Sequence, residues 1–376
     1  LYYKFKGEFI LPFFLSLFKN IFMNKFLILC FALLVISCQP EGNIDPINNS
    51  EYGKGLYVLT ENSVNYYDTK NNELNENIYQ STNGTSISNL NSINKHDKSI
   101  YIVSENTLYS VDVNTFFKNW ELNGFLNAQE CEYAKFNRLY VSDKNDSEIK
   151  VIDADLREII ARVKTGNNTN PTDIILSYER AFVVNSGNQT FNEYDSSICA
   201  INIKDGLVPL NEFAGNIIVD KNPVSICFNN GSVVVLCKGI YDELNMSQNT
   251  PSSIHLIGAG SLNIQASNIF NNLYDANNLT INNSNTKFYI TSSSGVYYIG
   301  VNSLNHTLVT DKKIPTVLEI NRESFANTDS TSMVVDFLYM NDKNNSDYIY
   351  KYNVYLDQFV DSFQVNSPVI DLKYFD

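Results

Sequence analysis

The sequence predicts an all-β fold, a β-propeller of about seven blades, and two observations support this prediction. An alternating strand with a central aromatic or apolar residue recurs along the chain, with that residue at Tyr57, Tyr101, Tyr140, Phe182, Val234, Tyr289 and Tyr339. The intervals are 44, 39, 42, 52, 55 and 50 residues by subtraction, and four-stranded propeller blades recur at roughly 40–50 residues. Helical repeats would need a 3.6-residue apolar pattern, which this sequence lacks.

Each module is expected to contain four strands in a constant order. A first strand, such as 170–178 or 222–229, precedes the aromatic second strand. The third strand is typified by SEIKVIDAD at 147–155, and a less regular fourth strand follows it. Because Asp favours the tight turns that join hairpin strands, four aspartates are expected to close third strands: Asp68, Asp112, Asp153 and Asp357.

The two ends of the repeat region predict how the ring closes. The first module starts at Gly55 with a second-strand pattern and has no first strand ahead of it. The last ten residues, Ser367 to Asp376, match the first-strand pattern. We therefore expect them to complete the first blade, which removes the exposed edges of an open sheet.

The chain is expected to have three parts: a leader at 1–37, a flexible tether at 38–54 and the propeller at 55–376. Within the leader, 23–37 read as an export signal with Lys25 ahead of an apolar run. The run is short for a membrane span, although a transmembrane anchor and a plain signal peptide remain alternatives. For 1–22, the alternatives are a misassigned start, with Met23 as the true one, and a second membrane segment.

The leader ends in Val35-Ile36-Ser37-Cys38, and this sequence resembles the lipobox of bacterial lipoproteins. The resemblance implies that Cys38 is the lipidated first residue of the mature protein. The following stretch is rich in Asn, Pro and Gly and cannot bury enough apolar area to fold alone. Its Gln39 and Glu41 resemble the acidic export signals of Bacteroidetes surface lipoproteins.

Composition limits the classes of partner. The chain has 27 Lys and Arg against 41 Asp and Glu, a formal charge of −14. A nucleic-acid partner is not expected, because phosphate binding needs clustered basic surface. Beyond Cys30 and Cys38 of the leader region, the four remaining cysteines show no framework spacing, and we expect them to be buried as small apolar side chains.

The segment Arg138 to Gly166, RLYVSDKNDSEIKVIDADLREIIARVKTG, resembles the YVTN-type (YncE-like) propeller repeat. Gly55 to Tyr79 also resembles the opening of Bacteroidetes surface lipoproteins of this fold, some of which bind cobalamin beside an outer-membrane transporter. The resemblance implies a lipid-anchored outer-membrane protein, on the cell surface or the periplasmic side. Only Glu61-Asn62 separates the first two strands here, where a longer Gly/Asn-rich insert is expected for the cobalamin-binding relatives.

No catalytic or cofactor motif stands out. The three histidines, His96, His255 and His306, fall in different modules without ligand spacing. The sequence DKND at Asp143 to Asp146 lacks the Gly and the bidentate Glu of a calcium loop. No metal site and no cofactor are therefore predicted.

In a propeller, the loops between second and third strands and the loops between blades share one face. We expect the ligand-binding residues there, with the insert Lys238 to Ser252 as the first loop to test and Tyr241 as a stacking surface. Their amide- and carboxylate-rich chemistry suits a small polar ligand. The candidate residues are Glu61, Asn62, Glu105, Asn106, Asp143, Lys144, Asn185, Lys238, Tyr241, Asn341 and Asp342.

These patterns favour a non-enzymatic, lipid-anchored cell-envelope propeller that binds a small molecule, glycan or partner protein, as an accessory to an outer-membrane transporter. The alternative is a propeller enzyme, a lyase or hydrolase, with carboxylates from several blades meeting at the channel mouth. A purely scaffolding role beside a transporter is a third hypothesis.

Overall fold

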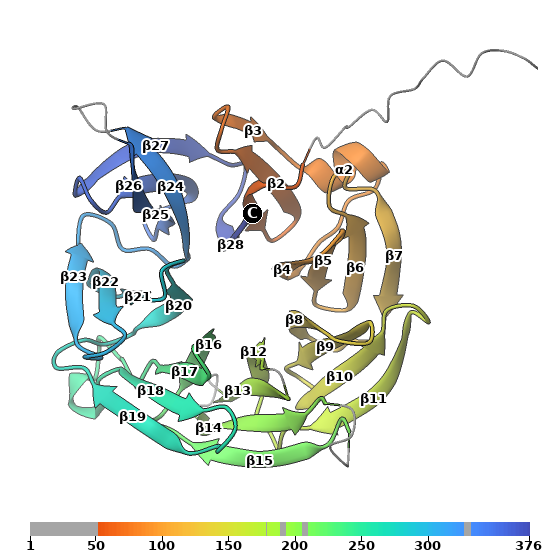
Figure 1. The fold of residues 1–376 in the computed structure, drawn as a ribbon, viewed down its shortest axis with the longest axis horizontal. Coiled ribbons are helices and arrows are strands. Elements are labelled where there is room, and N and C mark those ends of the chain that lie inside the picture. The colour runs from red at the N-terminus through yellow and green to blue at the C-terminus, as the bar shows by residue number, and fades with distance from the viewer. Residues whose placement is uncertain (1–51, 178, 189–192, 205–209, 327–331) are drawn as a thin grey trace, which may run out of the picture. The chain divides into compact units, whose positions relative to one another are not determined.

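The computed structural model describes residues 52–177, 179–188, 193–204, 210–326 and 332–376. These residues form seven four-stranded antiparallel sheets arranged as blades around a central channel (Figure 1). The fold is therefore the predicted seven-bladed β-propeller. The predicted leader and the lipidation residue Cys38 lie outside the described residues.

Each blade runs from an innermost first strand to an outermost fourth strand. Blade 1 contains β28 (Val369–Phe375), β1 (Gly55–Thr60), β2 (Ser63–Asp68) and β3 (Glu73–Asn75), and blade 2 contains β4 (Leu90–His96), β5 (Ser99–Ser104), β6 (Thr107–Asp112) and β7 (Lys118–Asn123). Blade 3 contains β8 (Ala128–Ala134), β9 (Arg138–Asp143), β10 (Glu148–Asp153) and β11 (Glu158–Lys164). Blade 4 contains β12 (Pro171–Leu176), β13 (Arg180–Asn188), β14 (Glu193–Asn202) and β15 (Phe213–Ile218). Blade 5 contains β16 (Pro223–Asn229), β17 (Ser232–Cys237), β18 (Ser253–Gly258) and β19 (Ile264–Ile269). Blade 6 contains β20 (Asn277–Ile281), β21 (Lys287–Ser292), β22 (Gly295–Gly300) and β23 (His306–Thr310). Blade 7 contains β24 (Leu318–Ala326), β25 (Ser332–Asp342), β26 (Asn345–Asn353) and β27 (Gln358–Gln364).

The C-terminal strand closes the ring, as the sequence predicts. In blade 1, β28 is the innermost strand and pairs antiparallel with β1, with Leu56 opposite Tyr374 and Tyr57 opposite Lys373. The closing strand thus comes from the far end of the chain. With β28 in place, blade 1 has four strands like the other blades, and the described sheets form a continuous ring.

The core consists of apolar layers between adjacent blades. Every residue of β1 is buried because both of its faces are covered by neighbouring blades. Between blades 1 and 2, Tyr57 packs with Ile102 and Phe116. The seven repeated residues from Tyr57 to Tyr339 are at most 5% exposed. Full burial of such a side chain contributes roughly 1.5–3 kcal/mol, which explains why an aromatic or apolar residue recurs in every second strand.

Three of the four predicted turn aspartates close third strands. Asp153 Oδ1 accepts hydrogen bonds from the backbone N–H groups of Asp155 at 3.0 Å and Leu156 at 2.9 Å. Asp68 and Asp112 accept the equivalent pairs of bonds in blades 1 and 2.

The prediction for Asp357 is wrong. In blade 7 the third strand ends at Asn353, whose Oδ1 accepts bonds from Tyr355 N–H at 2.9 Å and Leu356 N–H at 3.0 Å. Asp357 is the last residue of the turn, at φ 54°, and its carboxylate accepts the hydroxyl of Tyr352. An Asn side-chain oxygen makes this turn as well as an Asp does, and the pattern DYIYKYNVYLD contains both residues.

In the part of the chain that the structure describes, two short helices lie in the connections, and the sequence patterns did not predict them. Helix α2 (Ile78–Asn83) joins blade 1 to blade 2 and buries Ile78 and Tyr79 in the core. It ends at Gly84, which has φ 71° and donates its N–H to Gln80 O. The 3₁₀ helix η2 (Met246–Gln248) lies in the insert of blade 5. Within the part of the chain that the structure describes, no helix is long and apolar enough to span a membrane.

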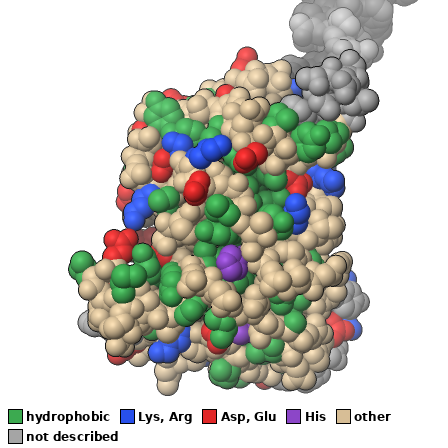
Figure 2. All heavy atoms as spheres, turned by 90° about the vertical axis from the view of Figure 1, so that its left-hand side faces the viewer, with side chains coloured by type: hydrophobic (Ala, Val, Ile, Leu, Met, Phe, Trp, Pro, Cys, Tyr) green, Lys and Arg blue, Asp and Glu red, His purple; other side chains and the backbone are tan. Residues whose placement is uncertain are grey.

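Three of the four cysteines that were expected to be buried are buried, whereas Cys227 is half-buried. Cys227 lies opposite Val234 in the β16–β17 hairpin, and Cys227 and Cys237 remain free. Cys131, Cys199 and Cys237 are fully buried. On the side of the ring that Figure 2 shows, acidic, basic and apolar side chains are intermingled, and no large basic field is present on that side.

Candidate ligand-binding face

The ring has two faces that differ in their connections. We call the side with the connections between second and third strands and between blades the loop face. We call the side with the first–second and third–fourth connections the turn face. The loop face carries the longest described connection within a blade, the insert between β17 and β18 at 238–252. The candidate residues predicted from sequence belong to this face, and they fall into three groups there.

The first group lines a cavity of about 780 Å³ beside the blade 5 insert. Lys238 and Tyr241 contribute from the insert itself. Blades 6 and 7 contribute Asp275 and Lys343, and blade 4 contributes Tyr194, so four blades build this cavity. Its volume is within the roughly 300–1,000 Å³ typical of small-molecule sites.

The cavity walls combine tyrosines with many polar side chains. The ring centroid of Tyr241 is 6.0 Å from that of Tyr274, at an interplanar angle of 32°. Tyr194 of β14 also lines the cavity. The polar lining groups include amides, carboxylates and hydroxyls from Asp242, Glu243, Asn245, Gln248, Asn277 and Ser293. Such walls can stack on a flat apolar face and hydrogen-bond hydroxyl or amide groups.

The insert is held in a defined shape by its base. Ile240 and Thr250 form an isolated antiparallel bridge, and Ile240 N–H also donates to Thr250 Oγ1 at 2.9 Å. Closer to the tip, Asp242 N–H donates to Asn249 Oδ1 at 2.7 Å. Gly239 adopts φ +74°, and a Cβ on it would come within 2.4 Å of Thr250 O. The base therefore requires glycine at this position.

Two lysines supply the positive charge of the cavity. Lys238 Nζ forms an ion pair with Asp275 Oδ1 at 2.7 Å, with both side chains about one-third exposed. Lys343 is exposed, and the described residues provide no ion-pair partner for it. Lys238 also lines a second cavity of about 200 Å³ together with Lys144 and Asn277. The structure thus brings together three of the predicted candidate residues, Lys144, Lys238 and Tyr241.

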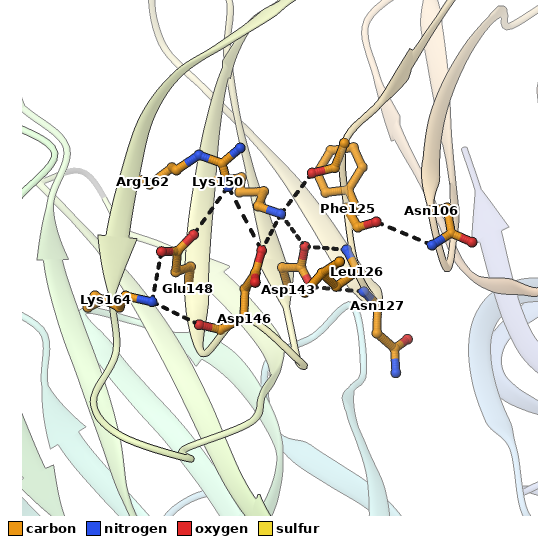
Figure 3. Close-up of polar contacts among 11 residues, drawn as sticks. Asn106, Phe125, Leu126, Asn127, Asp143, Asp146, Glu148, Lys150, Arg162 and Lys164 are labelled. Atoms are coloured by element: carbon orange, nitrogen blue, oxygen red, sulfur yellow. Dashed lines mark hydrogen bonds and ion pairs between the residues drawn. The ribbon is translucent and has the colours of Figure 1, made fainter.

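The second group of candidates is buried in structural roles. Figure 3 shows Asp143, which is 0% exposed and paired with Lys150 Nζ at 2.5 Å. The two oxygens of Asp143 also accept the backbone N–H groups of Leu126 and Asn127, each at 2.9 Å. Lys150 further pairs with Asp146 at 2.6 Å and donates to Gly124 O at 2.8 Å. The DKND sequence therefore holds the blade 2 to blade 3 connection in place through its carboxylates.

Blade 7 repeats this arrangement with an amide. Asn341 is fully buried, and its Oδ1 accepts Thr316 N–H at 2.8 Å and Val317 N–H at 3.1 Å. Asp342 is 6% exposed and lies 3.0 Å from Lys313. In blade 4, the buried Asn185 donates from Nδ2 to Ser197 Oγ at 3.2 Å. That these three residues contact a ligand stays a prediction.

The third group lies on blades 1 and 2, apart from the 780 Å³ cavity. Glu61 and Asn62 form the exposed loop between β1 and β2. Asn106 is exposed and donates to Phe125 O at 3.2 Å, whereas Glu105 is half-buried and its backbone bridges two connections. None of these four residues lines the cavity of blades 5 to 7. A role for them in ligand binding stays a prediction.

A cluster of ionisable side chains in the central channel was missed by the sequence patterns. It surrounds Lys373 of β28 and comprises Glu130 and Glu132 of β8, Asp173 of β12, Glu319 of β24 and Asp371 of β28. All six side chains are half-buried. A cavity of about 240 Å³ is lined by four of them, Glu130, Asp173, Asp371 and Lys373. These residues alternate with apolar core residues along the innermost strands, a signal that could have located them.

Burial is the main influence on these carboxyl groups. It raises the pKa of Glu130 and of Glu319 to about 8, and that of Glu132 to about 7. It also raises the pKa of Asp371 to about 6. The charge of Lys373 opposes each of these shifts without cancelling them.

Lys373 responds in the opposite sense. Burial acts to lower its pKa, but the surrounding carboxylates, Asp371 and Glu130 first, outweigh burial and raise the pKa above its ordinary value. The lysine therefore stays charged, while the channel carboxyl groups share a tendency to hold protons near neutral pH.

One histidine has both an acid and a hydroxyl as neighbours but not the geometry of a hydrolytic triad. His255 Nε2 lies 3.1 Å from Asp220 Oδ2 and 3.3 Å from Ser253 Oγ. A triad needs the acid and the nucleophile on opposite ring nitrogens, whereas here both contact the same one. Burial lowers the pKa of His255, although Asp220 acts to raise it. Among the described residues, no group of three or more His, Cys, Asp and Glu is arranged to hold a metal ion.

Comparisons with known proteins support the fold. No protein-family model matches the chain, and no curated protein matches it. Among solved structures, a quinonprotein alcohol dehydrogenase-like protein from Bacteroides thetaiotaomicron superposes with a TM-score of 0.62 at 14% identity, covering 86% of this chain and 78% of that one. Hydrazine synthase of Kuenenia stuttgartiensis gives a TM-score of 0.56 at 12% identity, covering 73% and 85%.

AztD from Citrobacter koseri, in its apo form, gives a TM-score of 0.51 at 10% identity and covers 85% of this chain and 97% of that chain. At these identities the similarity shows the fold alone, and the named functions belong to those proteins. The chain is a seven-bladed β-propeller, and these solved propellers share its fold.

Proposed function

We propose that this protein binds a small, hydroxyl-rich polar ligand, with a glycan as the favoured class, in the cavity beside the blade 5 insert. The observation that carries the proposal is the cavity of about 780 Å³ that Tyr241 lines together with amide, carboxylate, hydroxyl and ammonium groups from four blades. Sugars offer an apolar face for a tyrosine ring and hydroxyls for polar groups, and this cavity offers both counterparts.

The same proposal includes a setting for the protein. We infer a YVTN-repeat lipoprotein of the cell envelope, anchored through Cys38 to the outer membrane and acting as an accessory to an outer-membrane transporter. The support is the lipobox-like Val35 to Cys38, the Asn-rich tether and the repeat resemblance. Labelling of cells with an alkyne fatty acid tests the anchor, since Cys38→Ala is expected to abolish incorporation while a Cys30→Ala control keeps it.

Ligand binding is tested by calorimetric titration with a panel of oligosaccharides. Tyr241→Ala is expected to weaken binding on the order of tenfold or more, because stacking on a tyrosine contributes about 1–2 kcal/mol. Tyr355→Ala is the matched control, since Tyr355 is 56% exposed on the turn face. A control that lost binding as fully as Tyr241→Ala would contradict the assignment of the cavity.

A second candidate function is a lyase or hydrolase activity in the channel. It is favoured by one observation: carboxylates from blades 1, 3, 4 and 7 surround Lys373, and the pKa of Glu130 is raised to about 8, suited to a general acid near neutral pH. Turnover of any ligand found in the titration, abolished by Glu130→Gln but not by Tyr241→Phe, would support this activity. Intact ligand after prolonged incubation would count against it.

A further inference from the structure

The chain enters the propeller at the turn face. Tyr52 N–H, at the start of the described residues, donates to Asn114 O at 3.1 Å. Asn114 belongs to the turn between β6 and β7 of blade 2. Next to it, Gly53 N–H donates to the hydroxyl of Tyr57 at 3.0 Å, and Lys54 pairs with Asp376 at 3.1 Å. The entry point is therefore fixed on the turn face, between blades 1 and 2.

Large apolar side chains are exposed on the blades on either side of this entry point. Blade 2 exposes Phe117 and blade 3 exposes Phe136, each by 60%, and blade 3 also exposes Leu156 by 66%. On the other side, blade 7 exposes Tyr355 by 56% and Leu356 by 36%. We call these five residues the apolar arc. Its residues lie on the turn face of blades 7, 2 and 3, so they are on both sides of blade 1.

The turns themselves do not require these apolar side chains. Leu156 and Leu356 each precede the turn residue with positive φ, Arg157 at 59° and Asp357 at 54°. The blade 5 and blade 6 turns place Ser261 and Ser303 at the same position, ahead of Leu262 at φ 58° and Leu304 at φ 54°. The same turn therefore forms with serine at this position, and the exposed leucines of blades 3 and 7 are not needed to form it.

Basic side chains accompany the arc, although the chain as a whole has a charge of −14. The guanidinium carbon of Arg138 lies 5.7 Å from the ring centroid of Phe136. Lys135 and Arg157 are exposed beside Phe136 and Leu156 in the sequence. The nearby Asp155 already accepts a bond from Asn137 Nδ2 at 2.7 Å. The exposed acids Asp155 and Glu158 alternate with these cations. The apolar side chains would therefore provide most of the attraction to a lipid surface, and Lys135 and Arg157 would add contacts with anionic headgroups.

We propose that the turn face of blades 7, 1, 2 and 3 rests on an anionic lipid surface through the apolar arc, which leaves the loop face and its cavity directed away from the membrane. This contact with lipid is separate from ligand binding. The contribution of the tether to it rests on the proposed lipid anchor at Cys38. From Cys38 to Tyr52 is 14 residues by subtraction, and a random coil of that length has a root-mean-square span of about 20 Å. Such a tether holds the arc at millimolar effective concentration near the bilayer, so a weak contact suffices.

The experiment uses the mature chain from residue 38 with Cys38→Ser, so that no lipid contributes to binding. The protein is sedimented with vesicles of phosphatidylglycerol and phosphatidylcholine in equal parts, with lipid at about 10 mM so that a contact of millimolar strength is detected without the tether. The triple variant Phe117→Ser, Phe136→Ser and Leu156→Ser removes most of the arc at exposed positions. Leu244→Ser with Met246→Ser is the matched control, because these residues are 98% and 70% exposed on the loop face. Melting curves verify that each variant is folded.

The expected result is vesicle binding by the parent and the control, with on the order of a tenfold loss in the triple variant. The proposal is overturned if the parent does not bind vesicles, if the triple variant binds as well as the parent, or if the control loses binding. Glycan titration of the triple variant separates the two proposals, since its cavity is intact and its glycan affinity should equal that of the parent.

Discussion

Lys150 and Asp143, on adjacent strands of blade 3, form an ion pair of 2.5 Å in which the side chains are only 1% and 0% exposed (Figure 3). Both partners also bind the backbone of the connection from blade 2, through Gly124 O and through the N–H groups of Leu126 and Asn127. The pair therefore joins two blades as well as two strands. The buried Asp143 carboxylate thus accepts three hydrogen bonds, which offset part of the free-energy cost of removing it from water.

We expect Lys150→Met to destabilise the protein by about 3–5 kcal/mol, because it leaves the Asp143 carboxylate buried without its cation. Urea unfolding followed by tyrosine fluorescence measures the change. Lys144→Met, six residues away on the loop face, should stay within about 0.5 kcal/mol of the parent. Unfolding of Lys150→Met at the parental urea concentration would show that the pair does not hold the blades together.

Removal of 367–376 should prevent the ring from closing. The deletion takes away β28, and with it the innermost strand of blade 1 and the contacts of Leu372 and Val369 with blade 7. Removal of Asp376 alone is the matched control, because Asp376 is exposed and accepts surface bonds from Lys54 and Lys95. We expect the longer deletion to abolish the cooperative thermal transition and the control to keep it. A retained transition in the longer deletion would contradict the closure.

Stability should decrease as the pH rises through the range in which the channel carboxyl groups titrate. Their folded pKa values, about 8 for Glu130 and Glu319, lie above the ordinary value of 4.5. The folded state thus binds protons more tightly, and this stabilisation is complete below about pH 4.5 and lost as the pH approaches 8. Melting temperatures at pH 6 and pH 9 measure it. The double variant Glu130→Gln, Glu319→Gln should flatten the difference, and an unchanged difference would point to other groups.

Gly239→Ala should weaken ligand binding more than it weakens the fold. A Cβ at this position meets Thr250 O and Pro251 O at 2.4 and 2.6 Å, so the base of the insert must shift. Gly260→Ala is the control, since a Cβ there meets nothing within 4 Å. Titration with the bound glycan should show a loss on the order of tenfold for Gly239→Ala and none for Gly260→Ala. Equal affinities would mean that the insert does not shape the cavity.

The four described cysteines should be unreactive in the native protein. Burial raises the pKa of all four thiols, and Glu130 acts in the same direction on Cys131. A colorimetric thiol reagent at pH 8 should therefore release little colour until denaturant is added. Rapid reaction of the folded protein would show that at least one of the four thiols is accessible.

The strand order, the ring closure and the position of the insert could be predicted because they follow from local alternation and repeat spacing. Tyr57 and its equivalents are buried in every blade, so the repeat was visible as a pattern in the sequence. Local patterns do not locate every turn. Asn353, four residues before Asp357, provides the same kind of turn-forming oxygen, and the sequence does not say which of the two residues ends the strand.

The candidate site was predicted in part. Lys238 and Tyr241 line the main cavity. They could be predicted because they belong to a long insert in a regular repeat, and binding residues often lie on such loops. The structural roles of Asp143 and Asn341 could not be foreseen, because their partners belong to the connection from the preceding blade. Alternation with apolar residues along the innermost strands marks the members of the channel cluster around Lys373, but their meeting could not be foreseen, since they come from four blades and meet only once the ring is closed.

The most direct test of the account is a titration of the protein and of Tyr241→Ala with an oligosaccharide panel, with Tyr355→Ala as the control. The account predicts saturable binding of at least one hydroxyl-rich ligand by the parent and by Tyr355→Ala, and a loss on the order of tenfold in Tyr241→Ala. Binding that is equal in all three proteins would place the ligand elsewhere. Absence of binding across the panel would contradict a glycan site in this cavity.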